Sequence, residues 1–127
     1  MAYTNIEKET FIEKFKQKTK KFAIDVIHLC NNLPKNQACR TISFQLIKSA
    51  TSVGANYRAA CRGRSKAEFH SKISIVVEEA DESQYWLEIL KDGNLTNNKT
   101  EINRLLPEIE EIIKVVAKAR KTSSNSK

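Results

Sequence analysis

Apolar residues recur at intervals of three and four along four segments of the chain, and polar residues fill most of the positions between them. Because an α-helix turns once in about 3.6 residues, this spacing places the apolar side chains on one face of a helix. The predicted helices cover residues 4–33, 36–62, 65–91 and 98–121. The third segment also follows a seven-residue apolar repeat, which is typical of helices that pack closely along their length.

Several helix ends carry residues that commonly stand at helix boundaries. Pro34 follows the first segment, and a proline disfavours helical backbone in the residue before it. Gly63 stands where a glycine often follows a helix, and Ser65 with Glu68 has the spacing of a capping box at the start of the third helix. Pro107 interrupts the fourth segment, which predicts a kink or a short lead-in turn there.

Four amphipathic helices joined by short turns can bury their apolar faces together as an antiparallel, up-and-down four-helix bundle. The predicted fold class is therefore all-α, with a single domain over residues 1–121. Only three glycines and two prolines are available for turns, fewer than a β-sandwich or barrel would need. Residues 122–127 are polar and are expected to form a disordered tail.

The chain is basic, with 22 Lys and Arg residues against 15 Asp and Glu residues and a formal net charge of +7. Such a charge favours binding to polyanions through long-range attraction and counterion release. The longest apolar runs are far below the roughly 20 residues that span a bilayer, so no membrane partner is expected. An odd number of cysteines and the lack of a leader pattern favour the reducing cytoplasm.

Small residues cluster in the second predicted helix, where the chain reads SATSVGAN over residues 49–56. Serine, threonine and glycine are poor helix formers, yet the apolar spacing continues through this run, which favours a helix over a loop. Small side chains let a neighbouring helix approach closely, and Asn56 could hydrogen-bond across to another helix.

The second and third helices also carry apolar residues beyond one stripe, and part of this surplus is expected to meet another subunit. The surplus residues are Ile47, Ile75, Val77, Tyr85, Trp86 and Ile89. The residues predicted for helix packing or an oligomer interface are Ser49, Ser52, Gly54, Asn56, Tyr85 and Trp86.

Basic residues gather around the end of the second helix and the start of the third. They are Lys48, Arg58, Arg62, Arg64, Lys66 and Lys72. Guanidinium groups match phosphate oxygens in a bidentate fork, so this group is a candidate nucleic-acid-binding surface. In the alternative interpretation, the arginines pair with acidic residues of the third helix, which are Glu78, Glu79, Asp81 and Glu82.

Four short runs of sequence within residues 45–90 are similar to a known family. These runs are QL at 45–46, SATSVGAN at 49–56, EADE at 79–82 and WLE at 86–88. The chain resembles the 23S rRNA intervening-sequence proteins, also called S23-type ribosomal proteins. The resemblance implies a four-helix bundle assembled as a ring of identical subunits, a pentamer, with a basic surface proposed to meet RNA. Many relatives have an acidic residue soon after the asparagine, whereas this chain has Ala59 and Ala60.

Two kinds of catalytic site receive less support. Arg64 and His70 are spaced similarly to the arginine–histidine motif of HEPN ribonucleases, in which arginine stabilises a phosphorane and histidine moves protons. A motif this short arises readily by chance in a basic chain. The Glu-x-x-His pairs of di-iron bundles do not occur in the sequence, and the cysteines lack zinc-site spacing.

We therefore expect a non-enzymatic protein without cofactor, metal or small-molecule substrate. Its expected partners are further copies of itself and either RNA or another acidic molecule. A homo-oligomeric scaffold that binds no nucleic acid is the alternative, and a HEPN-like ribonuclease is a further one.

Overall fold

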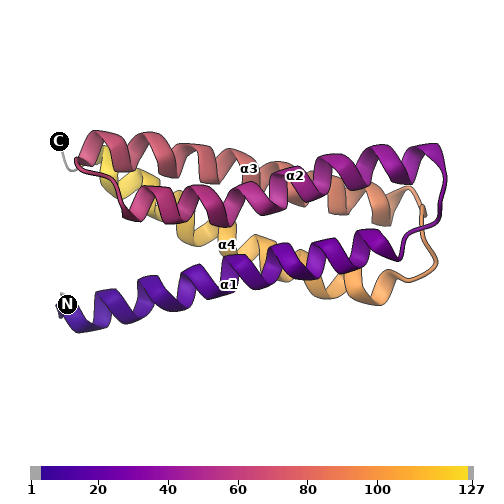
Figure 1. Ribbon diagram of the computed structural model, residues 1–127, viewed down its shortest axis with the longest axis horizontal. Helices are drawn as coiled ribbons and strands as arrows, with labels where there is room; N and C mark the ends of the chain where they lie inside the picture. Colours follow the sequence, from indigo (N-terminus) through magenta and orange to yellow (C-terminus); the bar gives the residue numbers. More distant parts are fainter. Residues whose placement is uncertain (1–3, 126–127) are drawn as a thin grey trace.

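The computed structural model describes residues 4–125, and four α-helices account for most of them. The helices are α1 (Asn5–Asn31), α2 (Gln37–Cys61), α3 (Lys66–Asp92) and α4 (Lys99–Asn125). Successive helices run antiparallel in an elongated bundle, and both chain termini lie at the same end (Figure 1). The predicted all-α, up-and-down four-helix bundle is therefore confirmed. No helix in the described part of the chain is long and apolar enough to cross a membrane.

Each of α1, α2 and α3 begins after a side-chain oxygen that accepts a hydrogen bond from a backbone N–H of the first turn. At α1, Thr4 and Glu7 form a complete capping box, which the sequence interpretation missed. At α3, the predicted Ser65 cap is confirmed, since its hydroxyl accepts from the N–H of Glu68. The Glu68 carboxylate, however, accepts from the N–H of Arg64, one residue before the cap.

In the turns after α2 and α3, no glycine takes the left-handed conformation that often ends a helix. Gly63 follows the C-cap Arg62 but does not have positive φ, so it is not a left-handed cap. The lack of a side chain at Gly63 lets the backbone pack closely. A Cβ there would lie 3.1 Å from the carbonyl oxygen of Ala60 and 3.2 Å from the amide nitrogen of Phe69. After α3, the left-handed position is taken by Asn94, with φ of 53°.

Of the two alternatives expected at Pro107, the lead-in turn is wrong, because the helix continues through this residue. The kink stays a prediction. The proline lies on the exposed side of α4, where the carbonyl that loses its partner can bond to water. Residues 122–125, expected to be disordered, extend the helix, and Ser123 Oγ lies 2.7 Å from His70 Nδ1 of α3. Residues 126 and 127 of the expected tail lie outside the described part.

The core lies along the axis of the bundle and is built from the four predicted stripes. The largest fully buried side chains are Leu46, Ile73, Leu87, Leu90, Ile102, Leu105, Ile109, Ile112, Val26, Val53, Val76 and Val116. Each buried side chain of this size contributes roughly 1.5–3 kcal/mol through removal of apolar surface from water. Most of the apolar surplus also packs against this core, namely Ile47, Val77, Trp86 and Ile89. Tyr85, by contrast, is 53% exposed.

Small residues of α2 bring it close to both neighbouring helices. Ser49 is fully buried and accepts a hydrogen bond of 2.9 Å from the Ser83 hydroxyl of α3. Gly54 faces α1, where a Cβ on the glycine would lie 3.2 Å from Thr19 Oγ1. Ser49 therefore lies at the contact between α2 and α3, and Gly54 lies at the contact between α2 and α1.

Two other residues predicted to pack behave differently. Asn56 does not bond across to another helix, because its amide donates to the carbonyl of Ser52 on α2 itself, at 2.9 Å. Short polar side chains often bond to their own helix backbone in this way. Trp86 is half-buried, and its Nε1 is buried without a hydrogen-bond partner among the described residues.

Candidate nucleic-acid interface

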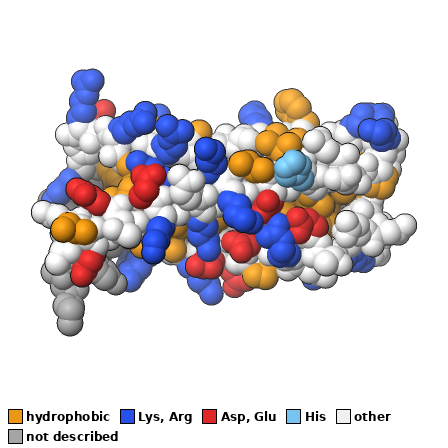
Figure 2. Space-filling model, turned by 60° about the horizontal axis from the view of Figure 1, so that its bottom comes forward, with side chains coloured by type: hydrophobic (Ala, Val, Ile, Leu, Met, Phe, Trp, Pro, Cys, Tyr) orange, Lys and Arg blue, Asp and Glu red, His pale blue; other side chains and the backbone are white. Residues whose placement is uncertain are grey.

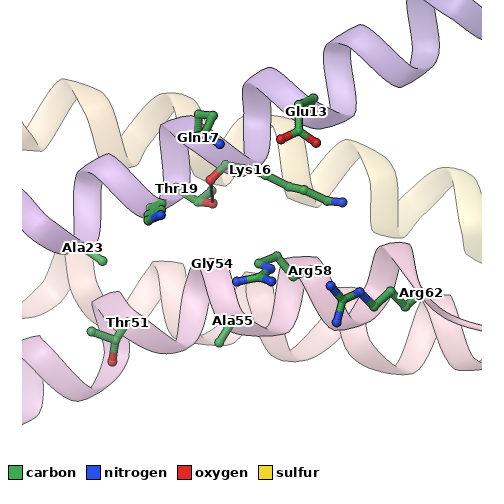
Figure 3. Close-up of a pocket in the computed structure, with 11 residues that line it drawn as sticks. Glu13, Lys16, Gln17, Thr19, Ala23, Thr51, Gly54, Ala55, Arg58 and Arg62 are labelled. Carbon is green, nitrogen blue, oxygen red and sulfur yellow. Dashed lines mark hydrogen bonds between the residues drawn. The ribbon is translucent and has the colours of Figure 1, made fainter.

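A groove of about 530 Å³ lies between α1 and α2. The helices are close at Gly54 and diverge toward the amino end of α1, and this divergence opens the groove (Figure 3). The lining residues of α1 are Glu13, Lys16, Gln17, Thr19, Lys20 and Ala23. Those of α2 are Thr51, Gly54, Ala55, Arg58 and Arg62.

The part of the lining nearest the helix contact is made of small side chains. Gly54, Ala55 and Ala23 add little bulk, and Gly54 and Ala23 are themselves buried. Thr19 is fully buried, and its hydroxyl donates to the carbonyl of Lys16 at 3.0 Å. The hydroxyl proton of Thr19 is therefore used within α1.

Four cationic side chains flank the groove, two from each helix. Lys16 and Lys20 are four residues apart on α1, and Arg58 and Arg62 are four residues apart on α2. Residues at this spacing lie one above the other on a helix, about 6 Å apart along its axis. Figure 3 shows Lys16, Arg58 and Arg62 reaching into the space between the helices. The groove therefore has two short rows of positive charge.

None of these four cations forms an ion pair with another described residue. The six ion pairs found among residues 4–125 involve other basic residues. Glu13 is the one carboxylate in the groove lining. On the face of the molecule shown in Figure 2, Lys and Arg side chains gather along the upper left, while acidic side chains are interspersed with basic ones below. An anion entering the groove would thus meet uncompensated charge.

The structure brings only two of the six predicted basic residues into this groove. Arg58 and Arg62 line it, while Lys48, Arg64, Lys66 and Lys72 do not. Arg64 lies in the turn between α2 and α3, and Lys66 begins α3. Lys48 lies on α2 and Lys72 on α3, so the predicted basic cluster is divided among the groove, the adjacent turn and other parts of these two helices.

The alternative pairing of these arginines with acidic residues of α3 does not form within one chain. No ion pair in the described part joins Arg58, Arg62 or Arg64 to the acidic group of α3, which is Glu78, Glu79, Asp81 and Glu82. The geometry explains this result, because Arg58 and Arg62 lie beside α1 rather than beside α3.

Lys16 and Lys20 were missed as site residues, since the sequence shows them only as part of a lysine-rich polar face. The sequence did indicate that Lys16 and Lys20 share one face of a helix, because they are four residues apart. Lys18 lies between them but projects toward α4, where it pairs with Glu108 at 3.6 Å and Glu111 at 3.0 Å. Residues two apart on a helix point in directions that differ by about 200°. Lys18 therefore faces α4, while Lys16 and Lys20 face the groove.

A second group of ion pairs links α1 to α4 away from the groove. The Asp25 carboxylate accepts from Lys21 Nζ at 2.8 Å and from Arg104 Nη2 at 3.0 Å. Burial acts to raise the pKa of Asp25, but the hydrogen bonds from the two cations together lower it below its ordinary value. The hydrogen bond from Arg104 likewise lowers the pKa of Glu101. This network therefore stabilises the helix contact and leaves no free anion-binding group.

The two residues of the HEPN-like hypothesis bond to different partners. His70 Nδ1 lies 2.7 Å from Ser123 Oγ of α4, whereas the backbone N–H of Arg64 donates to Glu68. Within residues 4–125, no hydrogen bond joins the side chains of Arg64 and His70. The same part of the chain contains no group of three or more His, Cys, Asp or Glu side chains placed to hold a metal ion.

The fold and the groove define a small four-helix-bundle protein with a basic interhelical surface. Residues 13–118 match the family described as 23S rRNA-intervening sequence protein, and the chain belongs to this family. It is also similar to a crystal structure from Bacteroides thetaiotaomicron, described as a protein with unknown function from the S23 ribosomal protein family. The two are 31% identical with a TM-score of 0.77, over 87% of this chain and 97% of the other. No curated protein matches the chain. The family resemblance drawn from the sequence is confirmed.

Proposed function

We propose that this protein is a non-enzymatic RNA-binding protein that engages structured RNA through the groove between α1 and α2. The observation that carries the proposal is the set of four uncompensated cations on one groove, Lys16, Lys20, Arg58 and Arg62. Arginine matches phosphate oxygens bidentately, and lysine adds point charges that follow a phosphate backbone. The name of the family, which refers to ribosomal RNA, favours RNA as the polyanion.

The groove charges imply a measurable dependence on salt. If each of the four cations neutralises one phosphate of a duplex, the slope of log affinity against log salt is about −3.6. Removal of Arg58 and Arg62 together should reduce the magnitude of that slope by about 1.8. The loss should be independent of RNA sequence, because phosphate contacts carry no sequence information.

The proposal is tested by salt-titrated binding of a structured RNA to the wild type and to two charge-matched double variants. Arg58→Ala with Arg62→Ala removes half of the groove charge, whereas Lys35→Ala with Arg40→Ala removes the same charge from exposed positions near the α1–α2 turn. We expect the first variant to lose most of the affinity and the second to lose little. Absence of binding at low salt, or an equal loss in both variants, would refute the proposal.

We further propose that binding takes place in the cytoplasm. The cysteines Cys30, Cys39 and Cys61 are free thiols in the structure. Free thiols suit a reducing compartment, where disulfides seldom persist.

Self-assembly is a second candidate function, favoured by large hydrophobic side chains that one chain leaves exposed. These are Ile6, Phe11, Ile24, Phe44 and Tyr85. A ring of identical subunits, such as a pentamer, could bury part of this surface. Light scattering at micromolar concentration tests the idea, and a monomer would exclude it. If the chain assembles without binding RNA at any salt concentration, the scaffold function is favoured instead.

A further inference from the structure

We infer that the groove holds the sugar-phosphate backbone of double-stranded RNA and does not read its base sequence. This inference rests on the proposed RNA-binding function and specifies the ligand of the same groove. Three properties of the lining support it. The lining lacks aromatic rings, its hydroxyl groups donate to backbone carbonyls of the protein, and the spacing of its cationic residues fits a run of phosphates.

Among residues 4–125, no aromatic side chain lines the groove. Proteins that hold single strands usually stack the bases on aromatic rings, which contributes about 1–3 kcal/mol per base. The aromatic residues next to lining residues in sequence, Phe15, Phe22 and Tyr57, are all buried. Tyr57 packs edge-on against Phe15, with ring centroids 4.8 Å apart. Phe11 is exposed, but it stacks on Phe15 and does not line the groove. Unpaired bases would therefore find no aromatic ring to stack on within the groove lining.

The neutral polar side chains of the groove are poorly suited to distinguish one base from another. The hydroxyl of Thr19 is buried and donates to a backbone carbonyl, and that of Thr51 donates to the carbonyl of Ile47 at 2.8 Å. Gln17 is the one lining residue with a side-chain amide. Thr51 is exposed and keeps acceptor capacity, which suits the 2′-hydroxyl of a ribose. Most of the available interactions therefore involve phosphate and sugar.

The spacing of the cations fits a run of phosphates. Within each pair, the backbone positions of the two cationic residues are about 6 Å apart along the helix axis, comparable to the separation of successive phosphates on one strand. The two rows, Lys16 with Lys20 and Arg58 with Arg62, flank the groove from opposite helices. A backbone lying between the rows would contact both, with its bases directed away from the protein. In a duplex those bases are already paired, so the protein need not supply partners for them.

The test compares four probes with one preparation of the full chain at several salt concentrations. The probes are an RNA hairpin with a fully paired stem, a second hairpin with a scrambled stem, an unstructured single-stranded RNA of equal length, and a DNA duplex. We expect the two hairpins to bind with affinities within about twofold of each other. We expect the single strand to bind at least about tenfold more weakly, and with a shallower salt slope of about 0.7 instead of 0.9 per phosphate.

Each other pattern of binding leads to a definite conclusion. Preference for the single strand, or for one stem sequence, would overturn the inference while leaving the proposed function intact. Equal or tighter binding of the DNA duplex would overturn the assignment to RNA. Failure of all four probes to bind at low salt would overturn the proposed function itself, and the inference with it.

A variant that is expected to bind more tightly gives an independent test, because misfolding would lower the affinity and could not explain a gain. Glu13 is exposed and is the one carboxylate of the lining, so Glu13→Gln should strengthen hairpin binding by roughly two- to fivefold at low salt. The matched control is Glu88→Gln, at an exposed position of α3 outside the groove. An unchanged affinity for the Glu13 variant, or an equal gain in the control, would show that the RNA does not occupy this groove.

Discussion

The contact between Gly54 of α2 and Thr19 of α1 gives the sharpest test of how the helices are held together. Gly54→Ala places a methyl group 3.2 Å from Thr19 Oγ1, 3.5 Å from its Cβ and 3.6 Å from its backbone carbon. The last two distances are ordinary van der Waals contacts. The first is too short, so Thr19 or the whole of α1 must move by a few tenths of an ångström.

Two effects of opposite sign determine the size of the change. Replacing glycine by alanine in a helix interior stabilises the helix by about 1 kcal/mol. Crowding in a packed interface typically costs about 1–3 kcal/mol. Thr19 cannot easily rotate away, because it is fully buried, β-branched and hydrogen-bonded to the carbonyl of Lys16. We therefore expect Gly54→Ala to destabilise the protein by up to about 2 kcal/mol.

A double-mutant cycle separates the two effects. In a Thr19→Ala background the crowding oxygen is gone, so Gly54→Ala should stabilise the protein by about 1 kcal/mol. In a Thr19→Ser background the oxygen remains, so the substitution should stay unfavourable. The free energy of unfolding is measured by urea denaturation, followed by the helical circular dichroism signal at one fixed protein concentration.

The reasoning is refuted if Gly54→Ala has the same effect in the wild-type and Thr19→Ala backgrounds. Equal effects would mean that α1 and α2 do not meet closely at this point. The groove would then lack the helix contact from which it opens.

Three further predictions concern other parts of the bundle. Asp25→Asn should lower the free energy of unfolding by about 0.5–1 kcal/mol near pH 7 because Arg104 loses a carboxylate partner. The pKa of Asp25 is lower in the folded protein than its unfolded value of about 4. The stabilisation by Asp25 is therefore present above about pH 4 and is lost as the pH falls through the folded pKa. Unfolding curves of the wild type and the variant should converge in acid. Burial raises the pKa of Cys30, which makes its reactive thiolate form scarce at neutral pH. The half-buried Cys61 should therefore react with iodoacetamide before Cys30 does. Labelling is measured by peptide mass spectrometry, and equal labelling of the two thiols would contradict this order. Pro107→Ala should stabilise the protein by about 1–3 kcal/mol because α4 is continuous there, and an unchanged or lower urea midpoint would show that the proline is accommodated at no cost.

The periodic pattern of the chain was sufficient to predict the number, order and approximate bounds of the helices. Local information also placed Ser65 at a helix start, as the structure confirms. These features depend on residues within one or two turns of each other. Pro107 is the exception, because the pattern predicted an interruption where the helix continues.

The groove could not be predicted in the same way. Lys16 and Lys20 lie far from Arg58 and Arg62 in the sequence and share one surface only because α1 packs antiparallel to α2. The rotation of each helix about its axis decides which lysines face the groove and which face α4. Local periodicity determines which face of a helix is apolar. The register and rotation between helices depend on long-range packing, which here includes the contact of one glycine with one buried threonine.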